Sequence, residues 1–435
     1  MRFHKVALAA VSLLCAGAAL PQTSPRDRMV VLISLDGFPA YALEDPNLPV
    51  PTLRKLIAEG ALARRMTTVN PTVTWPNHTA MVTGVSPARH GVLANGAIVR
   101  DGTGQHRKVE PWITKDKMVR AVTLYDLAHR AGLKTAQVDW VAIHKAPGIT
   151  FAFPEVPSAD GLIEREMLGS GMVSSADIGQ FGKKIIVWRD EVWTNAAAHI
   201  IRAHKPNLLL FHLLTLDSTH HTYGPRTLAG TVGMAFLDAQ VKRVLDAIRE
   251  AGMADKSTVV VVSDHGFKSY TKQIQPAVML EAAGLGDKAF ALPEGGSALV
   301  YCERGDAAAV AKVFENAEGV DRVADPREYA ALGLPDPDKD PQSPRVLLFA
   351  KSGYAFGGGR TGGNVVTRPT QGGGHGYASS DPEMDAIFIA SGYGIRKGTV
   401  VDRVRNIDIA PTLASLLGVR MENVDGRALR EILTQ

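Results

Sequence analysis

The sequence predicts an α/β fold: a doubly wound, mostly parallel sheet with helices on both faces and an inserted smaller subdomain. Three apolar runs, at residues 29–35, 207–216 and 259–262, have the nearly continuous hydrophobicity of strands buried on both faces. Segments with helical spacing lie between the runs, and an acidic residue stands just after each run. Strands that alternate with helices and end on polar groups indicate a parallel sheet with a site at its carboxyl edge.

The composition is that of an ordinary globular protein. The length of 435 residues predicts two or three domains, or one large α/β domain with an insertion. Hydrophobic residues make up 45% of the chain and charged residues 21%, which provides an ample core. The formal net charge of +4 is small and no basic stripe is present, which argues against a dedicated nucleic-acid binder. We therefore expect no nucleic-acid partner.

Residues 1–20 predict a secretory signal peptide. Basic residues precede an apolar run at residues 6–20, and residues 16–18 (AGA) fit an A-x-A cleavage site. The run is too short to span a bilayer comfortably. A lipoprotein anchor at Cys15 is a weaker alternative, because the preceding residues 13–14 (LL) match a lipobox poorly.

Cysteine usage agrees with export. Cleavage would leave Cys302 as the single cysteine, so no intramolecular disulfide could form. This suits a bacterial periplasmic enzyme better than a disulfide-stapled secreted domain. No later stretch is long and apolar enough for a transmembrane helix. We expect a periplasmic or secreted protein without stable membrane insertion.

Thr74 stands in a turn between two prolines, Pro71 and Pro76. Pro76 can be the first residue of a helix that continues through Met81. Thr74 would then lie at a helix N-terminus, where free backbone N–H groups favour a phosphate. The alternative is that Thr74 is only an N-cap, the commonest role of a threonine in that place.

The remaining pattern completes the alternation of strands and helices. Residues 151–182 have a weak pattern that predicts loops and short helices. Further helices are predicted at 51–60, 121–132, 190–203, 237–251 and 409–418, and further strands at 135–140 and 386–390.

Residues 268–362 are richer in glycine, proline and mixed charge than the rest of the chain, and they predict an inserted cap subdomain. Short strand-like pieces occur within them at 298–302 and 346–350. A Gly-rich segment at 357–374 leads to His375. It is either a flexible linker or a means of bringing His375 close to a metal.

Acidic and histidine side chains recur at the ends of the predicted strands. An isolated pair such as Asp264–His265 is more often a salt-bridged surface turn, but here the pattern repeats. Three carboxylates and three imidazoles suit zinc, or a mixed zinc and manganese site, far better than calcium. Six ligands are too many for one catalytic zinc and fit two ions roughly 3.5–4 Å apart. The candidate ligands are Asp36, Asp217, His221, Asp264, His265 and His375.

Five motifs together resemble the alkaline phosphatase superfamily and, within it, the nucleotide pyrophosphatase/phosphodiesterase family. In chain order they are residues 71–84 (PTVTWPNHTAMVTG), 86–95 (SPARHGVLAN), 217–225 (DSTHHTYGP), 263–267 (SDHGF) and 373–377 (GGHGY). The resemblance covers nearly the whole mature chain. It implies an alkaline-phosphatase-like fold with residues 28–267 and 363–435 as the catalytic core.

The resemblance also implies roles for the matching residues. Thr74 would be the nucleophile, and Asn95 would help to hold a phosphoryl oxygen. One metal would be held by Asp217, His221 and His375. The other would be held by Asp36, Asp264 and His265, with the Thr74 oxygen completing the site. The course would be two displacements through a phospho-threonine intermediate.

The chemistry of the residues agrees with these roles. A free threonine hydroxyl is a poor nucleophile at neutral pH, and a bound divalent cation can lower its pKa. The metals and the Asn95 amide can offset charge on the phosphoryl oxygens. Trp75 offers a flat apolar surface for an ester substituent or a base. The alternative for Trp75 is burial beneath the inserted subdomain.

Two positions depart from the family pattern. His220 stands where the family usually has glycine before the ligand histidine. His212, five residues before Asp217, stands where nucleotide-selective members tend to carry a base-stacking tyrosine, which weakens the case for nucleotide preference. Among the other histidines, His78 and His90 are expected to pack or orient the nucleophile turn.

The sequence thus predicts a periplasmic two-metal phosphodiesterase or nucleotide pyrophosphatase that hydrolyses phosphodiester or phosphoanhydride bonds. The resemblance implies a small-molecule phosphodiester or nucleotide substrate, with diesters preferred over monoesters. Phosphomonoesterases of the superfamily typically carry an arginine close to the nucleophile and a third metal, whereas here Trp75 follows Thr74 and no acid-rich set is left for a third ion. A phosphonate hydrolase similar to phosphonoacetate hydrolase is the close alternative. A non-catalytic binding protein on the same scaffold is disfavoured by the intact ligand set. A cell-envelope transferase is disfavoured by the lack of transmembrane segments.

Overall fold

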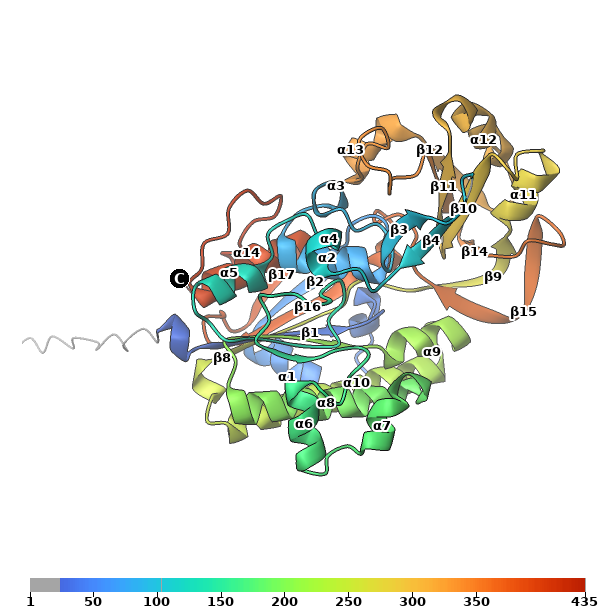
Figure 1. Cartoon of the computed structure of the whole chain (residues 1–435). Helices are drawn as coiled ribbons and strands as arrows, with labels where there is room; N and C mark the ends of the chain where they lie inside the picture. Colours follow the sequence, from blue (N-terminus) through green and yellow to red (C-terminus); the bar gives the residue numbers. More distant parts are fainter. Residues whose placement is uncertain (1–23, 103, 435) are drawn as a thin grey trace, which may run out of the picture.

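The structure is a computed structural model that describes residues 24–102 and 104–434 (Figure 1). The predicted signal peptide, with Cys15, lies outside these residues. Within the described ranges, none of the helices has the length and apolar character needed to cross a bilayer. Cys302 is buried on strand β11 (Ser297–Cys302).

An eight-stranded, mostly parallel sheet forms the centre of the molecule, in the order β17-β2-β16-β8-β1-β7-β5-β6. Strand β1 runs parallel to both neighbours, with Val31 opposite Leu209 of β7 and Val259 of β8. Strand β16 alone among these strands runs antiparallel to its neighbours. The strands are β1 (Met29–Leu35), β2 (Ala61–Thr67), β5 (Thr135–Val138), β6 (Phe151–Phe153), β7 (Leu208–Leu213), β8 (Ser257–Val262), β16 (Ala386–Gly392) and β17 (Thr399–Arg405).

Helices cover both faces of this sheet, as the apolar runs predict (Figure 1). Alternate residues of β1 enter two separate cores: Val31 and Ile33 enter one, Val30 and Leu32 the other. The first core is covered by α1 (Pro51–Glu59), α6 (Leu162–Gly169), α7 (Ser175–Gly179), α8 (Ile186–His204), α9 (Thr215–Tyr223) and α10 (Leu228–Glu250). The second is covered by α2 (Thr74–Thr83), α5 (Leu124–Arg130) and α14 (Ile409–Leu417).

A second, smaller set of sheets lies at one end of the molecule, drawn in yellow and orange in Figure 1. Its four-stranded antiparallel sheet has the order β10-β11-β13-β12 and carries two longer helices, α11 and α12. The new elements are β10 (Ala289–Glu294), β12 (Val320–Ala324), β13 (Val346–Ala350), α11 (Pro276–Ala282), α12 (Ala307–Phe314) and α13 (Tyr329–Leu332).

A three-stranded sheet joins this part to the centre of the molecule. Strand β9 (Lys268–Ile274) continues the chain from β8 and lies between β14 (Gly353–Phe356) and β15 (Val365–Gly374). The division of the chain at residues 267 and 362 stays a prediction. Strand β15 lies beyond that second boundary and nevertheless pairs with β9.

The sequence predicted one strand over residues 207–216, and this prediction is wrong in its second half. Strand β7 ends at Leu213, and helix α9 begins at Thr215. The Asp190 carboxylate accepts hydrogen bonds from the backbone N–H groups of Leu214 and Thr215, which satisfies donors at the helix start. Asp217 therefore lies in the first turn of a helix rather than at the end of a strand.

Two long helices also begin earlier than predicted. Helix α8 begins at Ile186, and α10 begins at Leu228, where the Thr227 side chain caps it by accepting from the Gly230 N–H. Leu228 is 80% exposed, so the first turns of α10 lack the buried apolar stripe on which the sequence argument depended.

Candidate active site and metal centre

The candidate ligands meet at the carboxyl edge of the central sheet. Asp36 follows β1, and the Asp264–His265 pair follows β8, the adjacent strand. Helix α9, which follows β7, carries Asp217 and His221 four residues apart. The sixth residue, His375, comes directly after β15. The structure therefore brings together all six residues that the sequence singled out, in two groups of three.

The first group, Asp36, Asp264 and His265, is here called the buried cluster, because all three side chains are fully buried. The Nε2 atom of His265 lies 3.4 Å from Oδ1 of Asp36 and 3.2 Å from Oδ2 of Asp264. The other Asp264 oxygen, Oδ1, accepts hydrogen bonds from the backbone N–H groups of Gly37 and His265. One oxygen of Asp264 is thus fixed by the backbone while the other faces the cluster.

The second group, Asp217, His221 and His375, is here called the open cluster, because the His221 side chain is 44% exposed. Oδ1 of Asp217 lies 3.3 Å from Nε2 of His221 and 3.7 Å from Nε2 of His375. The four-residue spacing on α9 places Asp217 and His221 on one face of the helix. The open cluster is therefore in contact with solvent on the His221 side.

Backbone carbonyl groups fix the three imidazole rings. Nδ1 of His265 donates to Gly266 O at 3.1 Å, Nδ1 of His221 to Gly373 O at 3.1 Å, and Nδ1 of His375 to Thr72 O at 3.0 Å. A ring that donates from Nδ1 presents Nε2 as its free lone pair. All three histidines therefore aim Nε2 into the clusters.

The second part of the Gly-rich segment, residues 365–374, is the strand β15, which pairs with β9, and residues 357–364 form a loop before it. Strand β15 passes so close to α9 that a Cβ atom on Gly373 would lie 2.4 Å from the His220 carbonyl oxygen. Glycine there lets the Gly373 carbonyl reach His221. At Gly376, φ is +85° and a Cβ atom would lie 1.8 Å from Glu294 O. The glycines on both sides of His375 thus allow the close approach that places it.

Unpaired buried atoms at the two clusters fit divalent metal ions. Oδ1 of Asp36, Oδ2 of Asp264, Nε2 of His265 and Oδ1 of Asp217 are buried and have no hydrogen-bond partner. Buried polar atoms without partners cost free energy, and metal coordination would satisfy all four at once. Carboxylate and imidazole groups in threes are also the donor set that zinc prefers. The residues present therefore fit two divalent ions.

Two of the three ligand imidazoles, those of His265 and His375, are held neutral by burial, whereas the charge of Asp217 raises the pKa of the His221 ring against the effect of burial. Burial lowers the pKa of His265 to about 4 and that of His375 to about 3, so both rings are neutral near pH 7. Burial raises the pKa of Asp36 well above its ordinary value, and the charges of Asp264 and Asp217 raise it further. Three carboxylates so close together call for positive charge, which bound cations would supply.

Thr74 is the first residue of α2 and is 8% exposed. The Thr74 carbonyl accepts a hydrogen bond from Nδ1 of His78 at 2.9 Å. The same His78 Nδ1 atom lies 3.7 Å from Oδ2 of Asp264. The first turn of α2 is therefore packed against the buried cluster. Two residues earlier, the Thr72 carbonyl accepts from Nδ1 of His375, so the same turn also holds a ligand of the open cluster.

Asn95 lies beside the Thr74 turn. Its side-chain oxygen accepts a hydrogen bond from the backbone N–H of Trp75 at 3.0 Å. This contact orients the amide, so that its NH₂ group remains as the donor. Asn95 is exposed and thus accessible to a substrate.

The apolar packing partners of Trp75 lie at residues 92–142 rather than at residues 268–362. Trp75 is 8% exposed and belongs to a small cluster of apolar residues from the first third of the chain. One side of it also lines a cavity of about 280 Å³ together with Trp112, Trp140 and Glu155. The packing partners are Val92, Met118, Val119, Val141 and Ala142.

The two positions that depart from the family pattern are both buried. The His220 ring packs edge-on against Phe267, and burial lowers its pKa to about 4. The His212 ring is fully buried and donates from Nε2 to Oδ2 of Asp36 at 3.0 Å. His212 therefore presents no exposed face to a substrate.

Sequence reasoning missed Asp139, which contacts His212 from the other side. Nδ1 of His212 lies 3.2 Å from Oδ2 of Asp139, which directly follows β5. The signal was available, because Asp139 is an acid at the end of a predicted strand, like Asp36 and Asp264.

A third group of possible ligands, Glu166, His199 and His204, lies between α6 and α8. Oε2 of Glu166 accepts hydrogen bonds from Nε2 of His199 at 2.7 Å and from Nε2 of His204 at 2.8 Å. Two ligands of one zinc ion would be roughly 3.3 Å apart, from bond lengths near 2.0–2.2 Å. These three side chains satisfy one another and form a hydrogen-bonded triad.

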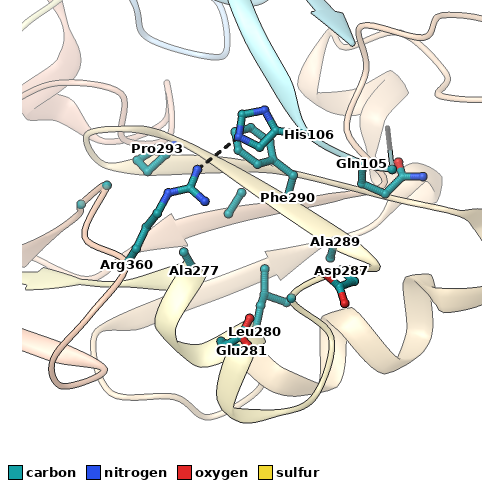
Figure 2. A pocket seen from close by; sticks show the side chains of 15 residues that line it. Gln105, His106, Ala277, Leu280, Glu281, Asp287, Ala289, Phe290, Pro293 and Arg360 are labelled. Carbon is teal, nitrogen blue, oxygen red and sulfur yellow. Dashed lines mark hydrogen bonds between the residues drawn. The ribbon is translucent and has the colours of Figure 1, made fainter. Parts of the chain in front are cut away.

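A cavity of about 680 Å³ lies away from both clusters, between α11, β10 and the loop before β4 (Arg107–Glu110) (Figure 2). Figure 2 shows the Arg360 guanidinium donating to Nε2 of His106 across this cavity, at 3.2 Å. None of the candidate catalytic, metal-ligating or substrate-binding residues lines it.

Comparison with known proteins gives one family. The profile described as "Type I phosphodiesterase / nucleotide pyrophosphatase" matches residues 30–378. Ectonucleotide pyrophosphatase/phosphodiesterase family member 7 of Rattus norvegicus is 24% identical over 97% of this chain and 91% of its own length. The venom phosphodiesterase of Macrovipera lebetinus is 22% identical over 90% of this chain and 43% of its own length.

Solved structures of murine ectonucleotide pyrophosphatase/phosphodiesterase 5 have a similar fold. An inactive threonine-to-alanine variant in complex with AMP superimposes with a TM-score of 0.73 at 19% identity, over 94% of this chain and 100% of that chain. The similarity confirms the predicted fold class, and the profile match confirms the resemblance drawn from the five motifs.

Proposed function

The chain belongs to the type I phosphodiesterase / nucleotide pyrophosphatase family of metal-dependent hydrolases, and we propose that it hydrolyses phosphodiester or phosphoanhydride bonds of small molecules at the two clusters. The observation that carries this proposal is the set of unpaired buried ligand atoms in two adjacent groups beside Thr74. Two divalent ions, which we propose to be Zn²⁺, would supply Lewis acidity and offset the negative charge of the reacting phosphoryl group.

Thr74 is the proposed nucleophile. Its oxygen would lose its proton and form a bond to phosphorus while the bond from phosphorus to the ester or anhydride oxygen breaks. The alcohol or phosphate part of the substrate would leave with a proton, and Thr74 would be left as phospho-threonine. Water would then displace Thr74 and release the phosphorylated product. The place of Thr74 at the start of α2, against the buried cluster, supports this role. A threonine-to-alanine variant of the murine relative is inactive, which supports it further.

Asn95 would donate to a phosphoryl oxygen. Its amide oxygen is occupied by the Trp75 N–H, so the NH₂ group is the part that can face a substrate. A hydrogen-bond donor that is already oriented needs little reorganisation when negative charge develops on the phosphoryl oxygen, so it stabilises that charge at little cost in free energy. Trp75 and the cavity that it lines would receive the ester substituent or base.

We propose a periplasmic or secreted location on the basis of residues 1–20. Expression of the full chain in a bacterial host, followed by fractionation and N-terminal sequencing of the mature protein, tests this. We expect a mature chain that begins shortly after residue 18. An uncleaved chain in the cytoplasmic fraction would contradict the proposed location.

A substrate panel tests the proposed reaction. We expect purified, zinc-loaded protein to hydrolyse a nitrophenyl phosphodiester and a nucleotide pyrophosphate bond, with little activity on phosphonoacetate. Preferred turnover of phosphonoacetate would favour the phosphonate-hydrolase alternative. Zinc binding without turnover of any phosphorus substrate would favour a binding protein on the same scaffold.

A further inference from the structure

Three buried polar residues lie in a line across three adjacent strands of the central sheet. Asp36 directly follows β1, His212 is on β7, and Asp139 directly follows β5. In the sheet order these strands are neighbours, and the register sets Ser34 opposite His212. All three of these side chains are fully buried.

His212 lies between the two aspartates, hydrogen-bonded to the Asp36 carboxylate on one side and to the Asp139 backbone on the other. Its Nε2 atom lies 3.0 Å from Oδ2 of Asp36. Its Nδ1 atom lies 3.1 Å from the backbone oxygen of Asp139 and 3.2 Å from Oδ2 of that residue. Each ring nitrogen therefore faces acceptor oxygens, so both act as donors.

The surroundings hold the ring in place. The His78 ring packs edge-on against His212, with centroids 4.4 Å apart, and Trp140 packs edge-on against His78 at 4.8 Å. Asp139 has a φ of +55° and donates its N–H to Phe153 O, so its backbone is fixed in the left-handed region. A ring enclosed in this way cannot turn away from Asp36 without repacking the core.

The two oxygens of Asp36 have different surroundings. Oδ2 accepts from His212, whereas Oδ1 has no hydrogen-bond partner and lies 3.4 Å from Nε2 of His265. Without His212, the carboxylate could rotate and present either oxygen. We propose that His212 is a positioning residue, anchored by Asp139, that aims Oδ1 of Asp36 at the metal of the buried cluster. This inference rests on the proposed metal centre.

The test is a metal titration specific for each cluster. A background with His221→Ala and His375→Ala leaves only the buried cluster, and a background with His265→Ala leaves the open cluster. Zinc affinity is measured in each by competition with a chromophoric chelator. We expect His212→Ala to weaken zinc binding at the buried cluster by roughly 10- to 100-fold, the usual effect of removing a group that orients a ligand. The open cluster should keep its affinity.

Two conservative variants keep the test valid if His212→Ala folds poorly. His212→Gln retains a donor for Asp36 and should bind zinc more tightly than His212→Ala. Asp139→Asn keeps a residue that tolerates a positive φ while it removes the anchoring charge, and it should weaken zinc binding at the buried cluster alone.

Asn207→Ala is the matched control. Asn207 is a buried residue just before the same strand, at the opposite edge of the sheet, where its side chain bonds to Lys134 N and Arg26 O. This variant should lower the melting temperature and leave both zinc affinities unchanged. An unchanged affinity at the buried cluster in His212→Ala would overturn the positioning role alone. A wild type that binds no zinc would overturn the proposed centre as well.

Discussion

The imidazole rings of His265 and His375 lie face to face, with centroids 3.8 Å apart and planes 13° apart. His265 follows a strand of the central sheet, whereas His375 follows β15, which pairs with β9. Their contact places the buried and open clusters side by side, although their ligands come from four separate parts of the chain. Two ions held in this way would be close enough to act on one phosphoryl group.

Metal removal should abolish activity. Each cluster offers three protein ligands. Removing the metal ions would leave four buried ligand atoms without any partner. Dialysis against a chelator should therefore stop turnover of a nitrophenyl phosphodiester, and zinc should restore it. Dialysis in the same buffer without chelator is the control. Full turnover by protein shown to be metal-free would contradict the two-metal proposal.

Thr74→Ala should retain both metals and lose nearly all turnover, because the nucleophile adds little to a set of six other ligands. Wild-type protein quenched rapidly during turnover should carry a phosphate on Thr74, detectable by mass spectrometry. Thr79→Ala is the control on the same helix: it removes one buried hydrogen bond to Trp75 O and should cost only about 1 kcal/mol of stability. A wild-type rate in Thr74→Ala would show that water attacks directly.

Diesters should be hydrolysed with a higher kcat/KM than monoesters. A monoester dianion carries an extra charged oxygen, whereas Trp75 and the adjoining cavity offer an apolar surface suited to an ester substituent. Trp75→Ala should cost on the order of 1–2 kcal/mol in transition-state binding of a nitrophenyl diester, with metal content unchanged. Trp75→Phe keeps a flat ring and should cost less.

Two outcomes would contradict different parts of this prediction, the diester preference and the role of Trp75. Equal or better turnover of nitrophenyl phosphate by the wild type would contradict the diester assignment. An unchanged Trp75→Ala variant would remove only the stacking role of Trp75, because packing against Val92 and Met118 would then be its whole contribution.

The triad of Glu166, His199 and His204 should make stability depend on pH. Burial opposes ionisation of Glu166, but hydrogen bonds from His204 and His199 bring its pKa below the ordinary value of 4.5. A carboxyl whose folded pKa is depressed stabilises the fold above its unfolded pKa, and the contribution is lost as pH falls through the folded pKa. Glu166→Gln should therefore lower the melting temperature at pH 7, with the difference shrinking below pH 4.5.

Glu250→Gln is the matched control for this experiment. Glu250 pairs with Arg202 at 2.6 Å, but the Glu250 side chain is 52% exposed, so water screens the pair. This variant should change the melting temperature little at either pH. A Glu166→Gln difference that persists undiminished at pH 3.5 would show that the triad is not the cause.

The sequence was sufficient for the fold class and for the grouping of the ligands. Buried strands such as β1 and β8 have continuous apolar sequences, and parallel strands bring the residues after them to one edge of a sheet. Asp36, Asp264 and His265 could be placed together by that rule. His375 could not, because its place depends on the pairing of β15 with β9, which no local pattern specifies.

Other features depend on tertiary contacts that the sequence does not reveal. Helix α9 begins where Asp190, 25 residues before Thr215, satisfies its first N–H groups, so the sequence pattern places Asp217 just after a strand rather than in a helix. The sequence distinguishes His212 only by the absence of a stacking tyrosine at that position. Its contacts with Asp36 and Asp139 require the order of β1, β7 and β5 in the sheet.

Anomalous diffraction from crystals of the zinc-loaded protein, collected at the zinc absorption edge, would locate the proposed metal ions. We expect two strong peaks roughly 3.5–4 Å apart, one beside Asp36, Asp264 and His265 and the other beside Asp217, His221 and His375. Thr74→Ala crystals should retain both peaks. A wild-type map with no peak at either cluster, or with a single peak at the Glu166 triad, would contradict the proposed two-metal centre.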